Sequence, residues 1–247
     1  MNQFGYNIPV LIWTRKRSKF MLLKLRNSNL LSIVLGARGT FLICFILLSC
    51  YLLYSVLAYT FLIPTGNFLG DIPSVLRGEF WRIITSTVYH YEWEHLLKNM
   101  LAIIVLGPFI EWKTGSFALV TSFFLSSWIG VLLFSFGFGG FIQSTFGIGT
   151  YIYSFYGASM SVYGLFPMAI IALLIKKPSF SLMTKFVLLG SFLYYFIVGF
   201  WPNPDASDAE VVVQIAHLCG FLAGFLCVLI ILILRNRKKI FSYLVSA

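Results

Sequence analysis

The chain has 247 residues, of which 59% are hydrophobic and only 11% are charged, whereas soluble domains have about 25% charged residues. This composition excludes an ordinary soluble or disordered protein. The net charge of +10 does not indicate a nucleic-acid partner, because most basic residues flank long apolar runs instead of sharing one solvated face. We therefore expect the basic residues to contact the lipid headgroups of a membrane.

Six apolar runs have lengths suited to crossing a bilayer. They cover residues 40–63, 96–110, 117–136, 158–175, 186–201 and 211–234. The second and fifth runs are short, so we expect them either to begin in the preceding loops or to lie in a locally thin bilayer. The sequence thus predicts an all-α membrane protein, a bundle of six transmembrane helices.

The basic residues predict how these spans are oriented. All 18 Lys and Arg except Arg77, Arg82 and Lys98 fall on one side of the six-span arrangement. By the positive-inside rule, both termini are cytoplasmic and the connection 64–95 is external. We expect a multi-pass protein of the cell membrane, with an external connection whose apolar composition favours a packed or half-inserted element over a solvated linker.

The chain is predicted to divide into three parts. Residues 1–38 form a basic cytoplasmic segment, for which an interfacial helix and an unstructured arm are both open interpretations. Residues 39–235 contain the six spans, and residues 236–247 form a short basic cytoplasmic tail.

The acidic residues narrow the chemistry of the membrane region. All eight lie in loops or at the ends of spans, and the zinc motif H-E-x-x-H is absent. Proton-driven transport and aspartyl or metal-dependent proteolysis are therefore unsupported, and we expect neither a metal nor a cofactor. A small transporter or channel is disfavoured, because the chain has neither charge at the middle of a span nor an internal repeat.

Two polar residues lie near the external ends of spans. His217 lies roughly 9 Å into the last span, where it is either a base or a structural histidine bonded to a carbonyl or hydroxyl. Ser159 begins the fourth span, where unpaired N–H groups favour a developing anion, although a serine there also serves as a simple helix cap. Gly157 allows close approach of the backbone, and Tyr163 lies at i+4 on the same face as Ser159.

Two more features place polar groups at the same depth. Gly220 and Gly224 share a helical stripe with His217 and form a small-x-x-x-small packing surface, which would let His217 reach Ser159 if the fourth span is the neighbour. His95 and Asn99, at i and i+4, face one way at the start of the second span. A serine, a base and imidazole or amide donors are the groups that acyl transfer requires.

The sequence resembles the rhomboid intramembrane serine proteases. The resemblance extends over about residues 78–234 and rests on Trp81-Arg82, His90 followed by His95-x-x-x-Asn99, Gly157-x-Ser159 and Ala216-His217-x-x-Gly220-x-x-x-Gly224. It implies a dyad of Ser159 as nucleophile and His217 as general base. It also implies an oxyanion hole from His95, Asn99 and the Ser159 N–H, with Tyr163 packed on His217 and a structural role for the Trp81-Arg82 loop.

One position departs from the family pattern. The residue after the nucleophile is usually small, but here it is Met160, which would narrow the substrate channel or shift the serine. We expect hydrolysis of peptide bonds in or near the transmembrane helices of membrane-protein substrates. The alternative is a catalytically weak or inactive rhomboid-like protein that binds transmembrane helices; the intact Ser159 and His217 favour the protease, whereas Met160 favours the alternative.

Overall fold

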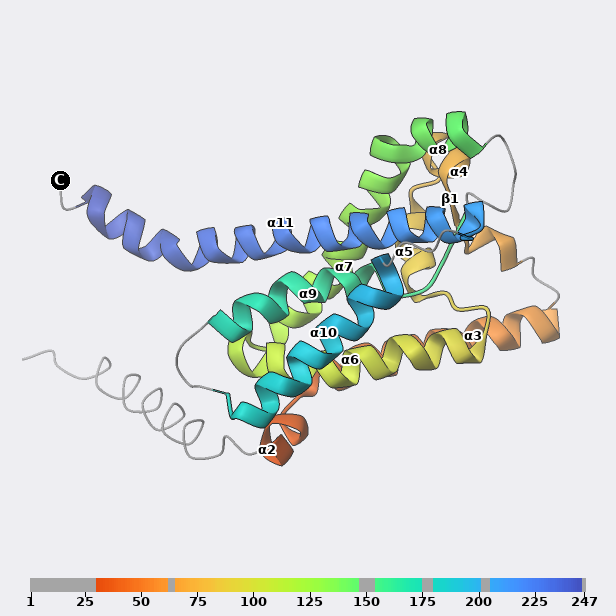
Figure 1. The fold of residues 1–247 in the computed structure, drawn as a ribbon. Helices are drawn as coiled ribbons and strands as arrows, with labels where there is room; N and C mark the ends of the chain where they lie inside the picture. The colour runs from red at the N-terminus through yellow and green to blue at the C-terminus, as the bar shows by residue number, and fades with distance from the viewer. Residues whose placement is uncertain (1–29, 62–64, 147–153, 175–179, 201–204, 246–247) are drawn as a thin grey trace, which may run out of the picture.

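The computed structural model describes residues 30–61, 65–146, 154–174, 180–200 and 205–245, and this part of the chain is a bundle of helices (Figure 1). Among the described residues, five helical segments are long and apolar enough to cross a membrane: α3 (Arg38–Phe61), α6 (Trp93–Thr114), α7 (Ser116–Leu132) with its continuation, α10 (Leu182–Phe200) and α11 (Asp208–Val245). A shorter apolar helix, α9 (Ser159–Leu174), corresponds to the fourth predicted run. The predicted all-α membrane bundle is thus confirmed.

The helices differ from the apolar runs mainly at their ends. The second and fifth helices have 22 and 19 residues and begin before their short apolar runs, at Trp93 and Leu182, which agrees with the expectation that these spans start in the preceding loops. The fourth helix, α9, has 16 described residues and so extends over roughly 24 Å. The third helix runs on through a π-helical segment (Leu133–Phe138) into α8 (Gly139–Phe146), and the last continues to Val245, into the predicted tail.

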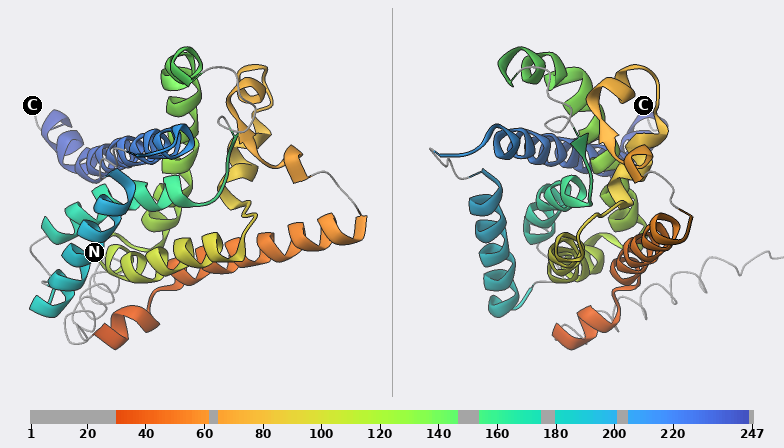
Figure 2. Two further views of the ribbon diagram at one scale, coloured as in Figure 1. Left: turned by 45° about the vertical axis from the view of Figure 1, so that its right-hand side comes forward. Right: turned by 90° about the vertical axis from the view of Figure 1, so that its right-hand side faces the viewer.

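Helix α9 lies in the middle of the bundle (Figure 2). It contacts α11, α7, α6 and α10, and most of its residues are buried. Glycines allow the closest of these approaches. A Cβ at Gly220 of α11 would lie 2.8 Å from Met160 Cα of α9, and a Cβ at Gly224 would lie 2.8 Å from Gly164 Cα, so the two backbones are in direct contact. The neighbour that the small-x-x-x-small stripe required is therefore α9.

A buried carboxylate joins three helices at the end of the bundle where α6 ends and α3 begins. Glu111, near the end of α6, accepts hydrogen bonds from the backbone N–H groups of Gly39 and Thr40 at 2.8 and 2.9 Å and from Ser116 Oγ at 2.6 Å. Its charge lies at the N-terminus of α3, where the unpaired N–H groups and the helix dipole favour an anion. One side chain thus connects α3, α6 and the beginning of α7.

The connection between α3 and α6 is a folded element, as its composition indicated. Its parts are a 3₁₀ turn (Thr65–Asn67), β1 (Gly70–Asp71), α4 (Ile72–Leu76) and α5 (Trp81–Val88). Arg82 is 8% exposed and binds Glu79 at 2.7 Å and the carbonyl oxygens of Gly66 and Leu69 at 2.8 and 2.7 Å. Trp81 begins α5 and is 54% exposed. Insertion of this element into the bilayer stays a prediction.

Strand β1 pairs with a second short strand that the sequence did not reveal, β2 (Ser154–Phe155). The pairing is antiparallel, with Gly70 opposite Phe155 and Asp71 opposite Ser154. Because the Phe155 ring occupies the space beside Gly70, a side chain at that position would collide with it. The pair attaches the connection to the segment that leads into α9. Residues 1–29 lie outside the described residues, and the predicted division of the chain stays a prediction.

Candidate active site

A cavity of about 480 Å³ lies at the end of the bundle where α6, α9 and α11 begin. Its lining includes Ser159, His217, His95, Asn99, Tyr163 and Gly157, all of them candidates from the sequence. Gly220 and Gly224 lie at the α9–α11 contact below it, whereas Trp81 and Arg82 belong to the neighbouring folded connection. The structure thus brings the candidate polar residues of three helices to one place.

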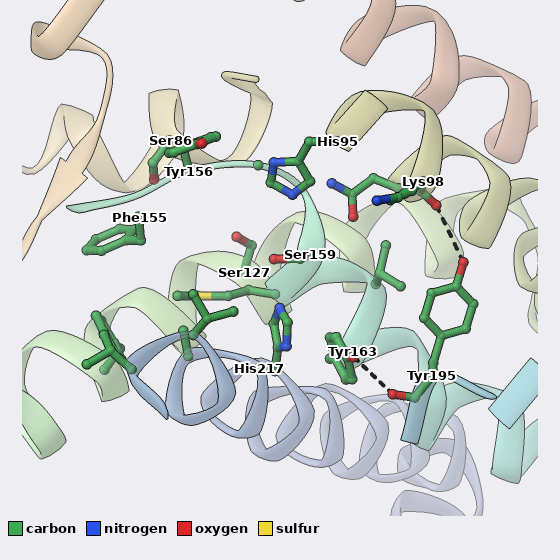
Figure 3. Close-up of a pocket in the computed structure, with 18 of the residues that line it drawn as sticks. Ser86, His95, Lys98, Ser127, Phe155, Tyr156, Ser159, Tyr163, Tyr195 and His217 are labelled. Atoms are coloured by element: carbon green, nitrogen blue, oxygen red, sulfur yellow. Dashed lines mark hydrogen bonds between the residues drawn. The ribbon is translucent and has the colours of Figure 1, made fainter. Parts of the chain in front are cut away.

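The side chains of Ser159 and His217 point toward one another between α9 and α11 (Figure 3). The structure has no hydrogen bond between these two described side chains. Hydrogen bonds between catalytic groups are often long in ligand-free sites and shorten when substrate binds. The Tyr163 ring stacks on His217, with the ring centroids 4.1 Å apart and the planes inclined by 19°. Tyr163 is held in turn by its hydroxyl group, which donates to the carbonyl oxygen of Tyr195 at 3.0 Å.

The backbone before Ser159 is shaped by Gly157. This residue has φ +94°, a left-handed conformation that glycine adopts without steric cost. Its N–H donates to Ser86 O at 2.8 Å, and a Cβ there would lie 2.6 Å from His95 Cε1. Ser159 is the first residue of α9, so its own N–H has no acceptor within the helix.

Asn99 and His95 reach the cavity from the first turns of α6. Asn99 is 6% exposed, and its amide nitrogen lies 3.0 Å from His90 Nε2. The His95 ring makes edge contacts with His90 at 5.2 Å and with Tyr156 at 5.5 Å between centroids. These contacts fix both side chains beside the backbone that leads to Ser159.

His90 has contacts in this site that the sequence reasoning did not foresee. It is 2% exposed, and its Nε2 also accepts from the backbone N–H of Ala158 at 3.2 Å. Burial, reinforced by the nearby His95, lowers the pKa of His90 to about 4. The signal available in the sequence was its position five residues before His95, which gives no indication of its hydrogen-bond partners.

Met160, the departure from the family pattern, lies in the cavity wall. It is 5% exposed and packs with Val212, Ala216 and Cys219 of α11. Its backbone is the part of α9 that approaches Gly220. The side chain and Ser159 both line the cavity, and whether Met160 affects activity stays a prediction.

Comparisons with known proteins found similar sequences. A family model described as the Rhomboid domain matches residues 77–234. The chain is also similar to RHOMBOID-like protein 5 of Arabidopsis thaliana, with 28% identity over 170 residues. That alignment covers 66% of this chain and 48% of the Arabidopsis protein, so the chain spans about half the length of this relative.

Proposed function

The chain belongs to the Rhomboid domain family, and from this premise we propose that it is an intramembrane serine protease. Its reaction is the hydrolysis of peptide bonds in or near transmembrane helices of membrane-protein substrates. The observation that carries the proposal is the placement of Ser159 and His217 side by side in one cavity, with Tyr163 stacked on the imidazole. No cofactor enters the mechanism.

In the proposed mechanism Ser159 Oγ attacks the carbonyl carbon of the peptide bond, and His217 accepts the hydroxyl proton. A serine hydroxyl is a weak nucleophile unless a neighbouring base takes this proton. When the tetrahedral intermediate collapses, the C–N bond breaks and His217 gives the proton to the departing amine. Water then attacks the acyl-enzyme with His217 again as the base, which releases the acid and restores Ser159.

The negative charge of the intermediate forms on the former carbonyl oxygen. We assign its stabilisation to three donors: the His95 ring, the Asn99 amide group and the Ser159 N–H. Fixed donors in a site that excludes water stabilise such a charge more than mobile water does. His95 and Asn99 are held on α6 by contacts with His90, so they do not have to reorganise during the reaction.

The proposed partners of the site are transmembrane proteins within lipid. Both termini are cytoplasmic in this proposal, so the cavity opens near the external face of the cell membrane. The position of His217, nine residues after the start of α11, supports a recessed site, because nine helical residues extend over roughly 14 Å. A substrate segment must therefore bend or unwind to bring its carbonyl group to the serine.

Labelling of the purified full chain with a fluorophosphonate probe tests the proposal. We expect the wild type to be labelled covalently and Ser159→Ala to be unlabelled. Ser161→Ala is the matched control, because Ser161 lies two residues further along α9, is fully buried and is outside the cavity lining. A folded wild type that neither reacts nor cleaves a transmembrane substrate would refute the protease. It would favour a rhomboid-like protein that only binds transmembrane helices, and the bulky Met160 in the cavity lining is the feature that favours this alternative.

A further inference from the structure

His90 is a buried histidine that takes no direct part in the bond-making and bond-breaking steps of the mechanism above. It lies between α5 and α6, and its ring nitrogens have three hydrogen-bond partners. Nδ1 lies 3.2 Å from Val88 O, and Nε2 lies 3.0 Å from Asn99 Nδ2 and 3.2 Å from Ala158 N. The ring therefore joins α6 to the backbone that leads into α9.

The partners determine the tautomer of this ring. Val88 O can only accept, so Nδ1 carries the hydrogen; Ala158 N–H can only donate, so Nε2 must present its lone pair. An acceptor at Nε2 requires Asn99 to offer its NH₂ group rather than its carbonyl oxygen, which settles the orientation of that amide. His90 is thus neutral, and one hydrogen of the Asn99 amide is bound to it while the other remains for a substrate.

We propose that His90 is a positioning residue for all three oxyanion donors, an inference that rests on the proposed function. It binds the Asn99 amide directly, and its ring contacts the edge of His95 at 5.2 Å. Through Ala158 N–H it also holds the peptide unit immediately before the one that carries the Ser159 N–H. The donors come from α6 and from the start of α9, and this one ring fixes their relative positions.

The fit of the backbone around the two histidine rings supports this role. A Cβ at Gly157 would lie 3.4 Å from His90 Nε2 and 2.6 Å from His95 Cε1, so the backbone lies directly against both rings. Loss of the His90 acceptor leaves two donors unpaired, and they are free to take other positions. A stabilising donor acts only when it lies about 3 Å from the oxyanion, so small displacements lower the rate.

The test compares two substitutions of His90 in the full chain. His90→Phe keeps an aromatic ring but removes the acceptor, and His90→Gln restores an acceptor oxygen. We expect His90→Phe to lower kcat about 10- to 100-fold, as removal of an orienting partner typically does, with KM for a transmembrane substrate unchanged. His90→Gln should recover part of this loss.

Thr87→Val is the matched control. Thr87 lies three residues away, is 1% exposed, and makes a buried hydrogen bond to Ser127 at 2.8 Å outside the proposed mechanism. The Thr87→Val substitution should lower the unfolding temperature without a comparable fall in kcat. Wild-type kcat in folded His90→Phe, or an equal fall in kcat in Thr87→Val, would overturn the inference.

A double-mutant cycle that combines His90→Phe with Asn99→Ala tests whether His90 acts by positioning Asn99 or acts independently of it. Because His90 acts partly through Asn99, we expect His90→Phe to cost less in the Asn99→Ala background than in the wild type. Fully multiplicative losses would overturn the inference. The same four proteins are compared by thermal unfolding, which requires no activity. If the wild type is inactive, the proposed protease function fails and the thermal-unfolding cycle is the remaining test. Non-additive changes in unfolding temperature support the His90–Asn99 contact, and additive changes refute it.

Discussion

Substitution of Gly220 by alanine tests whether the approach of α11 to α9 determines activity. The added Cβ would lie 2.8 Å from Met160 Cα and 2.9 Å from Met160 C, with the Met160 carbonyl oxygen closer still. Ordinary contacts begin near 3.4 Å, so α11 must move away from α9 by at least 0.6 Å. His217 lies one turn before Gly220 and is carried with the helix.

The expected losses of stability and of rate follow from this displacement. Overpacking of a tight contact costs about 1–3 kcal/mol of stability, and a displacement of about 1 Å at a reacting group lowers the rate about 100-fold. We therefore expect Gly220→Ala to lower kcat about 10- to 100-fold and to lower the unfolding temperature. The assay is single-turnover cleavage of a transmembrane substrate, together with thermal unfolding in the same detergent.

Two controls accompany this variant. Gly224→Ala makes a similar clash with Gly164 one turn further from the site, so it should lose stability with a smaller loss of rate. Gly190→Ala in α10 meets no neighbouring atom within 4 Å, so it should keep the kcat of the wild type and should not lower the unfolding temperature, because alanine favours the helix more than glycine does. If Gly220→Ala keeps the kcat of the wild type, the close approach of the two backbones does not set the Ser159–His217 geometry and the reasoning is wrong.

The other predictions concern the oxyanion donors, the orientation and the pH dependence of stability. Asn99→Ala should lower kcat about 10²- to 10³-fold with little change in KM, since its amide acts on charge that appears only in the transition state; single-turnover kinetics that show an unchanged rate would remove Asn99 from the hole. In a cysteine-free chain, Asp205→Cys should react with an impermeant maleimide from outside the cell and Lys185→Cys should not, and the reverse pattern would invert the proposed topology. His90 should make stability depend on pH, because burial lowers its pKa to about 4 in the folded protein from the ordinary histidine value of 6.5. As the pH falls, the unfolded chain binds the proton before the folded protein does. A contribution of about 3 kcal/mol to the free energy of unfolding is therefore fully present above pH 6.5 and is lost as the pH falls toward 4. Thermal unfolding over this range should show a steeper decline for the wild type than for His90→Phe, and parallel curves would contradict the assignment.

Much of the fold could be predicted from the sequence because lipid imposes a simple constraint on it. A helix that crosses hydrocarbon needs a long apolar run, and the six runs correspond to the six main helices. The ends of the helices were less predictable. Residues such as Glu111 are polar yet helical and buried, because their partners are backbone N–H groups of a neighbouring helix and not water.

The residues of the candidate site could be predicted from the sequence, but the hydrogen bonds and contacts among them could not. Ser159, His217, His95 and Asn99 could be named because each is a reactive or polar type near the same end of a span. The contact of His90 with Ala158 could not be read from the sequence, since the two residues lie 68 positions apart in the chain. Its contact with Asn99, nine residues further on, depends on how the loop before α6 turns the ring toward the helix, which no periodic pattern indicates. The pairing of Gly70 with Phe155 was likewise hidden because its segments lie far apart in the chain, and two-residue strands leave no periodic pattern.

The central position of α9 bears on the order in which the molecule is assembled. Two of its neighbours, α6 and α7, precede it in the chain, whereas α10 and α11 follow it. During synthesis α9 therefore enters the bilayer with part of its packing surface still facing lipid. The backbone of α9 at Gly164 gains its contact with Gly224 only when α11 arrives, and the same event brings His217 to Ser159. In a nascent chain Ser159 and His217 therefore stay apart until α11 has inserted, and under the proposed mechanism such a chain cannot cleave a substrate.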